Sequence, residues 1–388
     1  MALHDQSAPP APYPLVFDPI LMPKVWGGDR LARFGKAVRP GDRVGESWEL
    51  ADLDATSAGG AGGGAARSII RNGALAERAG QATLRDAMGL WGAAMLGGAR
   101  PTSAAGFPLL VKYLDAREHL SVQVHPSPAY AASHAGAHLK TECWYILDAA
   151  PGSVIFKGVK PGVTRADFER ALRSGTGADA GAGVVELLEA VPAIAGECHN
   201  LPSGTVHALG AGVLVAEVQT PSDTTFRVYD WAREYGRAGR ELHVEQALAC
   251  IDFGPAPRAT SLSATDGGDR AAARLVTTEF FTLDAARARP EGAGAASTPG
   301  AGFSRLLIGE GRGSTGRAYA LMLVSGAGRL VPREHARAAF DPVPLRAGDT
   351  ALVPAAIADD AVFEPAESAS GRSPDPSCIL LRAGVGAA

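Results

Sequence analysis

Short apolar runs, broken every few positions by glycine or proline, dominate the hydrophobic pattern of this chain. Many of the runs are rich in β-branched residues or alternate apolar with polar positions, which is typical of half-buried β-strands. The clearest runs lie at residues 154–156, 213–219, 226–229, 318–324 and 350–353. Many short strands at this spacing predict a mainly β protein, built as a sandwich or barrel with helical additions.

Helical patterns are few. Two stretches, Thr83-Leu-Arg-Asp86 and Thr164-Arg-Ala-Asp167, look like capping boxes, in which a threonine and an acidic residue three positions later exchange hydrogen bonds. Residues 242–251 also have helical spacing. The Pro-rich start and three segments rich in Gly and Ala or Ser (56–66, 174–183 and 290–302) can bury little apolar surface, so we expect them to form flexible loops.

Composition narrows the class of protein. A chain of 388 residues with 46% hydrophobic residues can form two or three domains at ~150 residues each. The net charge of −4 is well mixed, which excludes a basic stripe for nucleic acid or a polybasic membrane patch. The four cysteines lie far apart, which argues against a disulfide scaffold, and the first residues lack the pattern of a secretion signal. We therefore expect a cytoplasmic protein without a membrane span.

Polar residues stand beside two strand-like runs between residues 120 and 147. In a strand over 121–125, Ser121, Gln123 and His125 share one face, because side chains alternate along a strand. This triplet fits an ordinary solvated strand equally well, so alone it leaves both interpretations open. Glu142, however, begins a second strand pattern, Glu-Cys-Trp-Tyr-Ile-Leu, and His207 follows a Pro-Ser-Gly turn at the start of a third.

These side chains form a plausible ligand set. Gln123, His125, Glu142 and His207 offer an amide oxygen, two imidazoles and one carboxylate. This mixture of nitrogen and oxygen ligands suits zinc and leaves room for a water or substrate oxygen. An amide ligand leaves more positive charge on the metal than a second carboxylate would, which favours polarisation of neutral hydroxyls and carbonyls.

The spacing Gly196-x5-Pro202-x-Gly204-x2-His207 resembles the second metal motif of the cupin superfamily. The first motif is replaced by Gln123-x-His125, with an insertion before Glu142. These departures, together with an ordered series of further stretches, resemble the type I mannose-6-phosphate isomerase family in its shorter bacterial form. The resemblance covers most of residues 15–255, and its other stretches are 23–28, 45–50, 107–112, 140–145, 202–212, 217–230 and 240–243.

The resemblance implies two cupin (jelly-roll-like) β-barrels with a small helical segment. Residues 1–255 would form the metal-binding catalytic domain with helical insertions, and residues 256–388 a cupin-like domain without metal ligands. Gly348-x5-Pro354 repeats the motif spacing there, but the glycine and histidine that should follow are missing, and Ala355-Ala-Ile-Ala358 follows the proline. The implied activity is the interconversion of mannose 6-phosphate and fructose 6-phosphate through a cis-enediol, with one Zn²⁺ per chain. We expect a monomer whose partner is the phosphosugar substrate.

The resemblance also places the catalytic side chains. The active-site arginine of the family falls on Arg227, its lysines on Lys140 and Lys112, and its acidic residue on Glu217. We expect Lys112 and Ser121 to bind substrate, and Arg227, Lys140 and Glu217 to be catalytic. From the residues alone, Lys140 is better read as a surface lysine at a strand entry, Lys112 could be an edge-strand lysine, and Ser121 an ordinary strand serine.

Structural roles also compete for other positions. Arg227 could pair with Asp223 or Asp230 rather than contact substrate. Glu46 and Trp48 belong to a family stretch, and we expect them to give structural support only. Residues 197–200 depart from the family and are expected to form a turn.

Two other classes of function stay open from the sequence. One is a metal-dependent cupin oxygenase, although those proteins more often use histidine-rich iron sites. The other is a metal-binding cupin that acts on or senses another phosphosugar without isomerase activity. Leu139 leaves room for this second class, because longer family members tend to carry a histidine there.

Overall fold

The computed structural model describes residues 9–54, 66–77, 80–102, 106–174, 181–264, 268–269, 272–288, 305–309, 316–336, 340–366 and 378–386. Most of the four segments expected to be flexible loops falls outside these residues. The chain divides into two compact units. The first, unit 1, consists of Met1–Asp18, Arg67–Pro108 and Arg270–Ala388, and the second, unit 2, consists of Pro19–Ala66 and Leu109–Asp269. The boundary expected at residues 255 and 256 stays a prediction. The units differ from it by assigning 1–18 and 67–108 to unit 1 and 256–269 to unit 2.

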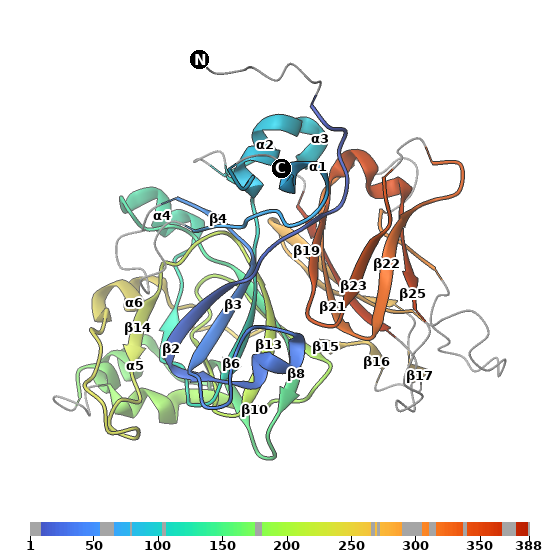
Figure 1. Cartoon of the computed structure of the whole chain (residues 1–388). Helices are drawn as coiled ribbons and strands as arrows, with labels where there is room; N and C mark the ends of the chain where they lie inside the picture. The colour runs from blue at the N-terminus through green and yellow to red at the C-terminus, as the bar shows by residue number, and fades with distance from the viewer. Residues whose placement is uncertain are drawn as a thin grey trace. The chain divides into compact units, whose positions relative to one another are not determined.

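Unit 2 is built on two antiparallel sheets (Figure 1). A seven-stranded sheet has the order β15-β11-β8-β13-β6-β2-β3, and a five-stranded sheet the order β10-β9-β12-β7-β14. The strands are β2 (Ile20–Gly28), β3 (Val44–Leu50), β6 (Leu110–Ala116), β7 (Val122–Val124), β8 (Glu142–Ala149), β9 (Val154–Val159), β10 (Leu188–Pro192), β11 (Glu197–Leu201), β12 (His207–Leu209), β13 (Val213–Gln219), β14 (Phe226–Tyr229) and β15 (Thr260–Ser261).

The remaining elements of unit 2 are short. They are η1 (Arg30–Phe34), β4 (Asp52–Leu53), α4 (Pro128–Ser133), α5 (Arg165–Leu172), η3 (Ala182–Leu187), α6 (Val244–Cys250), β16 (Ser263–Ala264) and β17 (Gly268–Asp269), and the chain passes into unit 1 along β5 (Ala66–Arg67).

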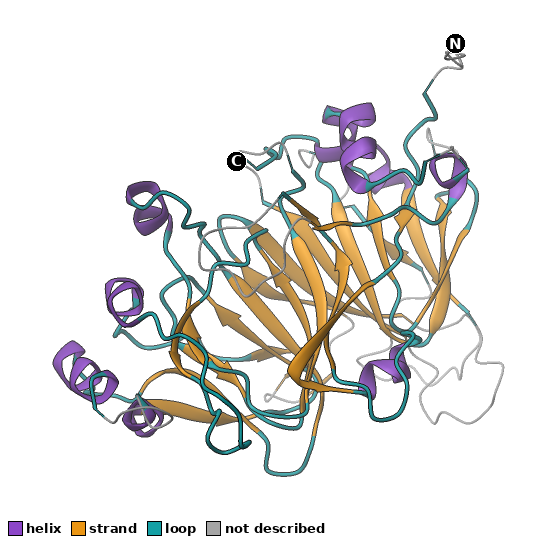
Figure 2. Ribbon diagram, turned by 60° about the vertical axis from the view of Figure 1, so that its left-hand side comes forward, coloured by secondary structure: helices purple, strands orange, loops and turns teal. Residues whose placement is uncertain are grey.

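Unit 1 also contains two antiparallel sheets, with the orders β1-β24-β21-β26-β19-β18 and β20-β25-β22-β23. Its strands are β1 (Leu15–Val16), β18 (Ala272–Thr277), β19 (Phe281–Ala288), β20 (Leu306–Leu307), β21 (Tyr319–Ser325), β22 (Ala327–Pro332), β23 (Val343–Arg346), β24 (Thr350–Val353), β25 (Ala361–Pro365) and β26 (Cys378–Val385). Its helices are α1 (Gly73–Ala76), α2 (Leu84–Trp91), α3 (Ala93–Leu96) and η4 (Ala355–Asp360). Strands predominate among the described residues (Figure 2), so the mainly β prediction is confirmed.

The local predictions correspond closely to these elements. The runs at 213–219 and 226–229 are β13 and β14, and both capping boxes form, at Thr83 before α2 and at Thr164 before α5. The turn expected at residues 197–200 is wrong, because these residues form most of β11. Their backbone pairs with β8, from Cys198 opposite Tyr145 to Leu201 opposite Glu142, and this ladder overrides the local sequence.

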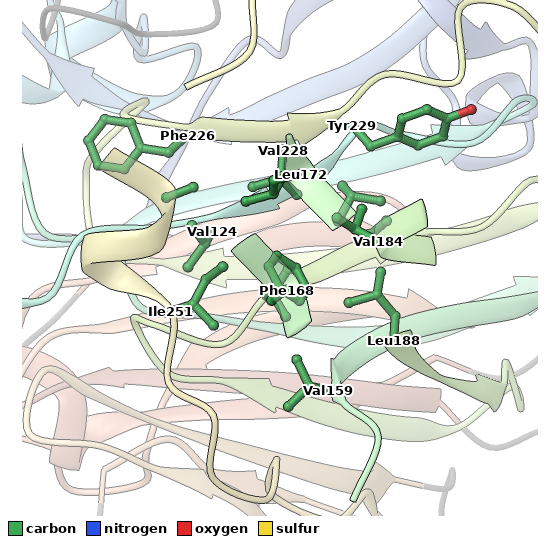
Figure 3. Packing of buried hydrophobic residues seen from close by; sticks show 14 of the residues in the cluster. Val124, Val159, Phe168, Leu172, Val184, Leu188, Phe226, Val228, Tyr229 and Ile251 are labelled. Atoms are coloured by element: carbon green, nitrogen blue, oxygen red, sulfur yellow. The ribbon is translucent and has the colours of Figure 1, made fainter. Parts of the chain in front are cut away.

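Three helical elements, α5, η3 and α6, pack buried side chains against one face of the five-stranded sheet (Figure 3). Phe168 and Leu172 of α5 and Val184 of η3 are buried, and they belong to the same apolar cluster as Val124 and Val228 of the sheet. Buried side chains of this kind contribute about 1.5–3 kcal/mol each. Because strand side chains alternate, this packing fixes the sheet and turns Gln123, His207 and Arg227 toward the opposite face.

Two predictions from composition can be compared with the described residues. Cys143, Cys198, Cys250 and Cys378 are all buried and free, as expected of cysteines outside a disulfide scaffold. None of the helices that the structure describes combines the length and the apolar character needed to cross a bilayer.

Candidate metal site and pocket

Strand register gathers the expected site residues of the five-stranded sheet. Gln123 of β7 lies directly opposite His207 of β12 on one side and Arg227 of β14 on the other. Residues that lie opposite one another in antiparallel strands face the same side of the sheet, so the three side chains form one row. His125 follows β7 by one residue and lies within reach of the same row.

The seven-stranded sheet contributes a second row. Glu217 of β13 lies between Lys112 of β6 and Trp144 of β8, in register with both. Glu142 is the first residue of β8 and lies two positions before Trp144, on the same face. The structure therefore brings the expected ligand Glu142 to the same face as the expected catalytic residue Glu217.

His125, Glu142 and His207 form a buried cluster whose candidate ligand atoms all lie within 4.8 Å of one another. His207 Nε2 is 3.2 Å from Glu142 Oε1, and His125 Nε2 is 3.5 Å from Glu142 Oε2. The fourth expected ligand joins them, because the Gln123 amide nitrogen is 3.3 Å from His207 Nε2. A half-turn of that amide brings its oxygen to the same place, since the two ends of the group have the same shape.

The hydrogen bonds of the two histidines show which ring nitrogen carries the proton. His125 Nδ1 donates to the carbonyl of Thr224 at 2.9 Å, and His207 Nδ1 donates to that of Thr205 at 2.8 Å, because a carbonyl can only accept. Both Nε2 atoms therefore present lone pairs to the oxygens of Glu142, and His125 Nε2 has no hydrogen-bond partner in the described part of the chain. The lone pairs of two imidazoles therefore converge on a carboxylate that offers them no proton, an arrangement that fits a bound cation.

Electrostatics also keep His125 in the form that binds a metal. Burial, together with the positive charge of Lys140, lowers the pKa of His125 to about 3. The imidazole is then neutral at physiological pH, as metal coordination requires. Lys140 itself is buried with its Nζ 2.9 Å from Glu142 Oε2, although β8 begins at Glu142 and does not extend back to it.

Lys112 lies in a network of buried charges. Its Nζ is 3.3 Å from Glu217 Oε1 and 3.6 Å from Glu46 Oε2. Burial alone would lower the pKa of Lys112, but the two carboxylates outweigh it and raise the pKa above its usual value. Burial and the charge of Glu142 raise the pKa of Glu217, against the opposing effect of Lys112. Lys112 thus stays a cation, while Glu217 is the carboxylate more able to hold a proton.

Sequence reasoning missed the part that Glu46 and Trp48 play. Both side chains line the pocket, and Trp48 Nε1 donates to Glu46 at 2.6 Å. Burial opposes ionisation of Glu46, yet Lys112, Lys24 and this hydrogen bond lower its pKa to about 2. The available signal was the alternation in Gly45-Glu-Ser-Trp-Glu, which turns Glu46 and Trp48 to one face of β3.

A single pocket in unit 2 collects nearly all of these groups. The triad of His125, Glu142 and His207 lies beneath its surface, and Gln123 and Lys140 connect the triad to the opening. The pocket is lined by Lys24, Trp26, Glu46, Trp48, Lys112, Leu114, Leu120, Ser121, Gln123, Lys140, Trp144, Glu217, Asp223, Thr225, Arg227 and Arg240. All five residues expected to be catalytic or substrate-binding are therefore in one place, but their roles stay predictions.

Arg227 does not form the expected structural pair with Asp230. Asp230 pairs with Arg240 instead, at 2.7 Å, and Arg227 Nη1 donates to the carbonyl of Glu241 at 2.9 Å. Burial and the charge of Arg240 lower the pKa of Arg227 to about 10. Arg240 was not among the expected site residues, because its place beside Arg227 depends on a backbone pairing that the local sequence does not reveal.

A two-sheet β fold with a buried histidine and carboxylate cluster beneath a polar pocket defines a cupin protein with a candidate metal site. Comparison with known proteins narrows this class. The chain is 34% identical over 273 residues to mannose-6-phosphate isomerase of Streptococcus mutans, which covers 70% of this chain and 77% of that protein. It is also 34% identical over 272 residues to mannose-6-phosphate isomerase ManA of Bacillus subtilis, covering 70% and 78%. This chain therefore belongs to the mannose-6-phosphate isomerase family.

Solved structures agree with this family. A crystal structure of the mannose 6-phosphate isomerase from Bacillus subtilis matches with a TM-score of 0.68 and 25% identity, over 95% of this chain and 99% of that one. A zinc-bound holo structure of mannose 6-phosphate isomerase matches with a TM-score of 0.65 and 18% identity, over 96% and 99%, and shows the common fold. No family model matches the chain.

Proposed function

We propose that this protein is a zinc-dependent aldose–ketose isomerase that interconverts mannose 6-phosphate and fructose 6-phosphate. The observation that carries the proposal is the convergence of two imidazole Nε2 atoms on the Glu142 carboxylate, at the base of a pocket lined by acidic and basic side chains. The names of the two bacterial relatives support the reaction, and the zinc-bound relative supports the metal.

The residues present fit one Zn²⁺ per chain. Gln123, His125, Glu142 and His207 would hold it, and the carbonyls of Thr205 and Thr224 keep both imidazoles in the metal-binding tautomer. When bound, zinc supplies a Lewis acid that polarises the hydroxyl and carbonyl oxygens of an open-chain sugar.

The isomerisation moves a proton between C1 and C2, and we propose that it passes through a cis-enediol. Two side chains that can carry a proton, Lys140 and Glu217, face the pocket beside the metal cluster. A positioned base of this kind contributes typically about 10²–10⁴-fold to the rate. Trp144 Nε1 donates to Glu217 at 2.8 Å and holds that carboxylate in place.

Other pocket residues would bind the substrate and its developing charge. Lys112 keeps its proton, so its ammonium can donate hydrogen bonds to sugar hydroxyls, and the Ser121 hydroxyl shares the ligand face of β7. Arg227 presents a guanidinium that stabilises negative charge in the pocket. In this proposal Arg227, Lys140 and Glu217 are catalytic, and Lys112 and Ser121 bind substrate.

A coupled assay tests the proposal. Fructose 6-phosphate formation from mannose 6-phosphate would be followed with purified protein, then after chelation, and again after zinc return. We expect activity that disappears and returns. A folded, zinc-loaded protein without turnover would contradict the isomerase and direct attention to binding of another phosphosugar, whereas oxygen uptake with bound iron would indicate an oxygenase.

The proposal also covers the oligomeric state and the cellular compartment of the protein. We propose a monomer in the cytoplasm, supported by four free, buried cysteines that suit a reducing compartment. Size-exclusion chromatography with light scattering tests the first part, because a dimer would elute at twice the mass of the chain.

A further inference from the structure

Two guanidinium groups meet at one side of the pocket, and only one has a carboxylate partner. Asp230 accepts from the backbone nitrogen of Arg240 at 2.8 Å, from Nε at 3.0 Å and from Nη2 at 2.7 Å. Among the described residues no carboxylate lies within ion-pair distance of Arg227, whose Nη1 donates to the Glu241 carbonyl and whose buried Nε has no hydrogen-bond partner. The pair therefore carries positive charge that these contacts leave uncancelled.

The lysines of the pocket contrast with these arginines. Lys112 lies within 3.6 Å of both Glu46 and Glu217, and Lys24 is 3.4 Å from Glu46. Two buried carboxylates thus balance two ammonium groups on this side. A dianion placed there would face the carboxylates at close range, and repulsion between like charges in a desolvated pocket is costly.

The guanidinium side is also separated from the candidate metal site. Gln123 lies on β7, Arg227 lies on the edge strand β14, and residues 240–243 run beside that edge, where His243 N donates to the Arg227 carbonyl at 2.8 Å. Neighbouring strands are about 4.8 Å apart, so this segment lies roughly 10 Å from Gln123. The Arg227 side chain, which faces the same side of the sheet as Gln123, donates from Nη1 to the carbonyl of Glu241 in this segment.

We propose that Arg240, together with Arg227, binds the phosphate group of the substrate, and that Arg240 makes the pocket select phosphorylated over unphosphorylated sugars. The identity of the sugar rests on the proposed function. In a hexose 6-phosphate the phosphate is at the opposite end of the carbon chain from C1 and C2, as the separation of the two ends of the pocket requires. A phosphate carries about two negative charges and three acceptor oxygens, which suit forked guanidiniums.

The environment of the pair supports this assignment. Burial lowers the pKa of Arg227 most, and repulsion from Arg240 lowers it further; a bound anion relieves this repulsion. The Arg240 side chain keeps about a third of its surface exposed, so its guanidinium can both hold Asp230 and accept a ligand from solvent. Arginine offers five donors, of which the contact with Asp230 uses two from the side chain.

Calorimetric titration of inorganic phosphate into the zinc-loaded full chain tests phosphate binding without reference to turnover. We expect Arg240→Gln to weaken binding roughly 10- to 100-fold, because a charge-assisted pair is lost. Arg237→Gln is the matched control: Arg237 belongs to the same segment but pairs with Glu118 at 2.9 Å and does not line the pocket. We expect that variant to bind phosphate as the parent does.

A second variant keeps the test decisive if Arg240→Gln does not fold. Asp230→Asn removes the carboxylate that shares Arg240, so phosphate should bind more tightly. Unchanged or weaker binding by a folded Asp230→Asn protein overturns the proposal. So does parent-like binding by Arg240→Gln, an equal loss in Arg237→Gln, or no phosphate binding by the parent.

Kinetics separate this inference from the proposed function. For Arg240→Gln, KM for mannose 6-phosphate should rise by the factor seen with phosphate, kcat should change less, and preference over mannose should fall. If the protein is an isomerase but Arg240→Gln leaves its phosphate affinity unchanged, only this inference is contradicted. Phosphate binding that depends on Arg240 in a protein without turnover contradicts the proposed function alone.

Discussion

Residues 196–207 of unit 2 and 348–359 of unit 1 start alike, with a glycine, five residues and a proline, and then diverge. Gly196 and Gly348 both have left-handed backbones, with φ of 90° and 95°. In unit 2, Gly204 at φ 92° makes a second such turn, and His207 begins β12. In unit 1 alanines follow the proline, the chain forms η4, and Ile357 is buried there.

The two interiors differ accordingly. In unit 2 the faces that meet the pocket present imidazoles, carboxylates and ammonium groups. The core of unit 1 is apolar instead and is formed by Val16, Ala288, Ile308, Tyr319, Leu321, Leu323, Leu330, Val343, Leu345, Ala351, Val353, Ile357, Ala358, Ala361, Phe363, Cys378 and Leu380. A similar two-sheet architecture is therefore built around an apolar core in unit 1, where Ala356 and Asp359 stand at the motif positions of Gly204 and His207.

The largest expected effect comes from removing His207, the histidine of the motif that unit 1 replaces with Asp359. His207→Ala should lose bound zinc and lower kcat/KM by on the order of 10³-fold or more, because polarisation by a metal is worth several kcal/mol. Metal analysis and the coupled assay measure both. Full zinc content with parent-like turnover would remove His207 from the site.

A substitution in the core of unit 1 should have the opposite result, a loss of stability without a loss of zinc or turnover. Phe363 is fully buried, and Phe363→Ala should lower the free energy of unfolding by about 3–5 kcal/mol through the cavity it leaves. The folded fraction should keep its zinc and its turnover per molecule. Denaturant unfolding and zinc content are the measurements, and loss of zinc from the folded protein would contradict the division of roles.

A smaller loss of activity should accompany Glu217→Gln, which keeps the shape of the side chain but cannot carry the proton. We expect turnover to fall by about 10²-fold with zinc retained. Deuterium uptake from solvent into the sugar at C1 or C2 reports the proton transfer itself. Normal uptake in this variant would show that another group, with Lys140 first, moves the proton.

Two glycine variants probe the shared motif. Gly204→Ala is strained by its positive φ, and its Cβ would lie 3.0 Å from the Cys250 carbonyl oxygen. We expect a loss of about 1–3 kcal/mol in stability and weaker zinc binding, because the turn positions His207. Gly348→Ala should cost a similar amount through its φ but leave zinc affinity unchanged. Equal effects on zinc would contradict the comparison.

The smallest effect concerns acid. The pKa of Glu46 is about 2, below its ordinary value of 4.5, so the folded state binds its proton less readily than the unfolded state. The resulting stability is complete above pH 4.5 and is lost as the pH falls toward 2. Amide exchange in β3 and β6 should therefore quicken on acidification more than in β21 and β26, and Glu46→Gln should reduce that difference. Identical acid responses in the two pairs of strands would contradict this.

Local signals in the sequence predicted the individual helices and strands. The composition of the pocket and the sheet order depend on pairing between segments that are far apart in the sequence. The run at 213–219 and the box at Thr164 contain their own pattern, and so does the His207 motif. By contrast, Arg240 reaches the pocket because residues 240–243 lie beside β14, and β1 joins β24 across more than three hundred residues. Periodicity and capping cannot encode such pairings, because each half of the pair looks ordinary alone.

The most direct test of the account is a zinc titration of chelated protein with isomerase activity as the readout. The account predicts no conversion of mannose 6-phosphate without metal, a linear rise with added zinc, and a plateau at one Zn²⁺ per chain. The His207→Ala protein should stay inactive throughout the same titration. Conversion by the metal-free protein, or full zinc loading without conversion, would contradict the central claim that the cluster of Gln123, His125, Glu142 and His207 binds the zinc on which isomerisation depends.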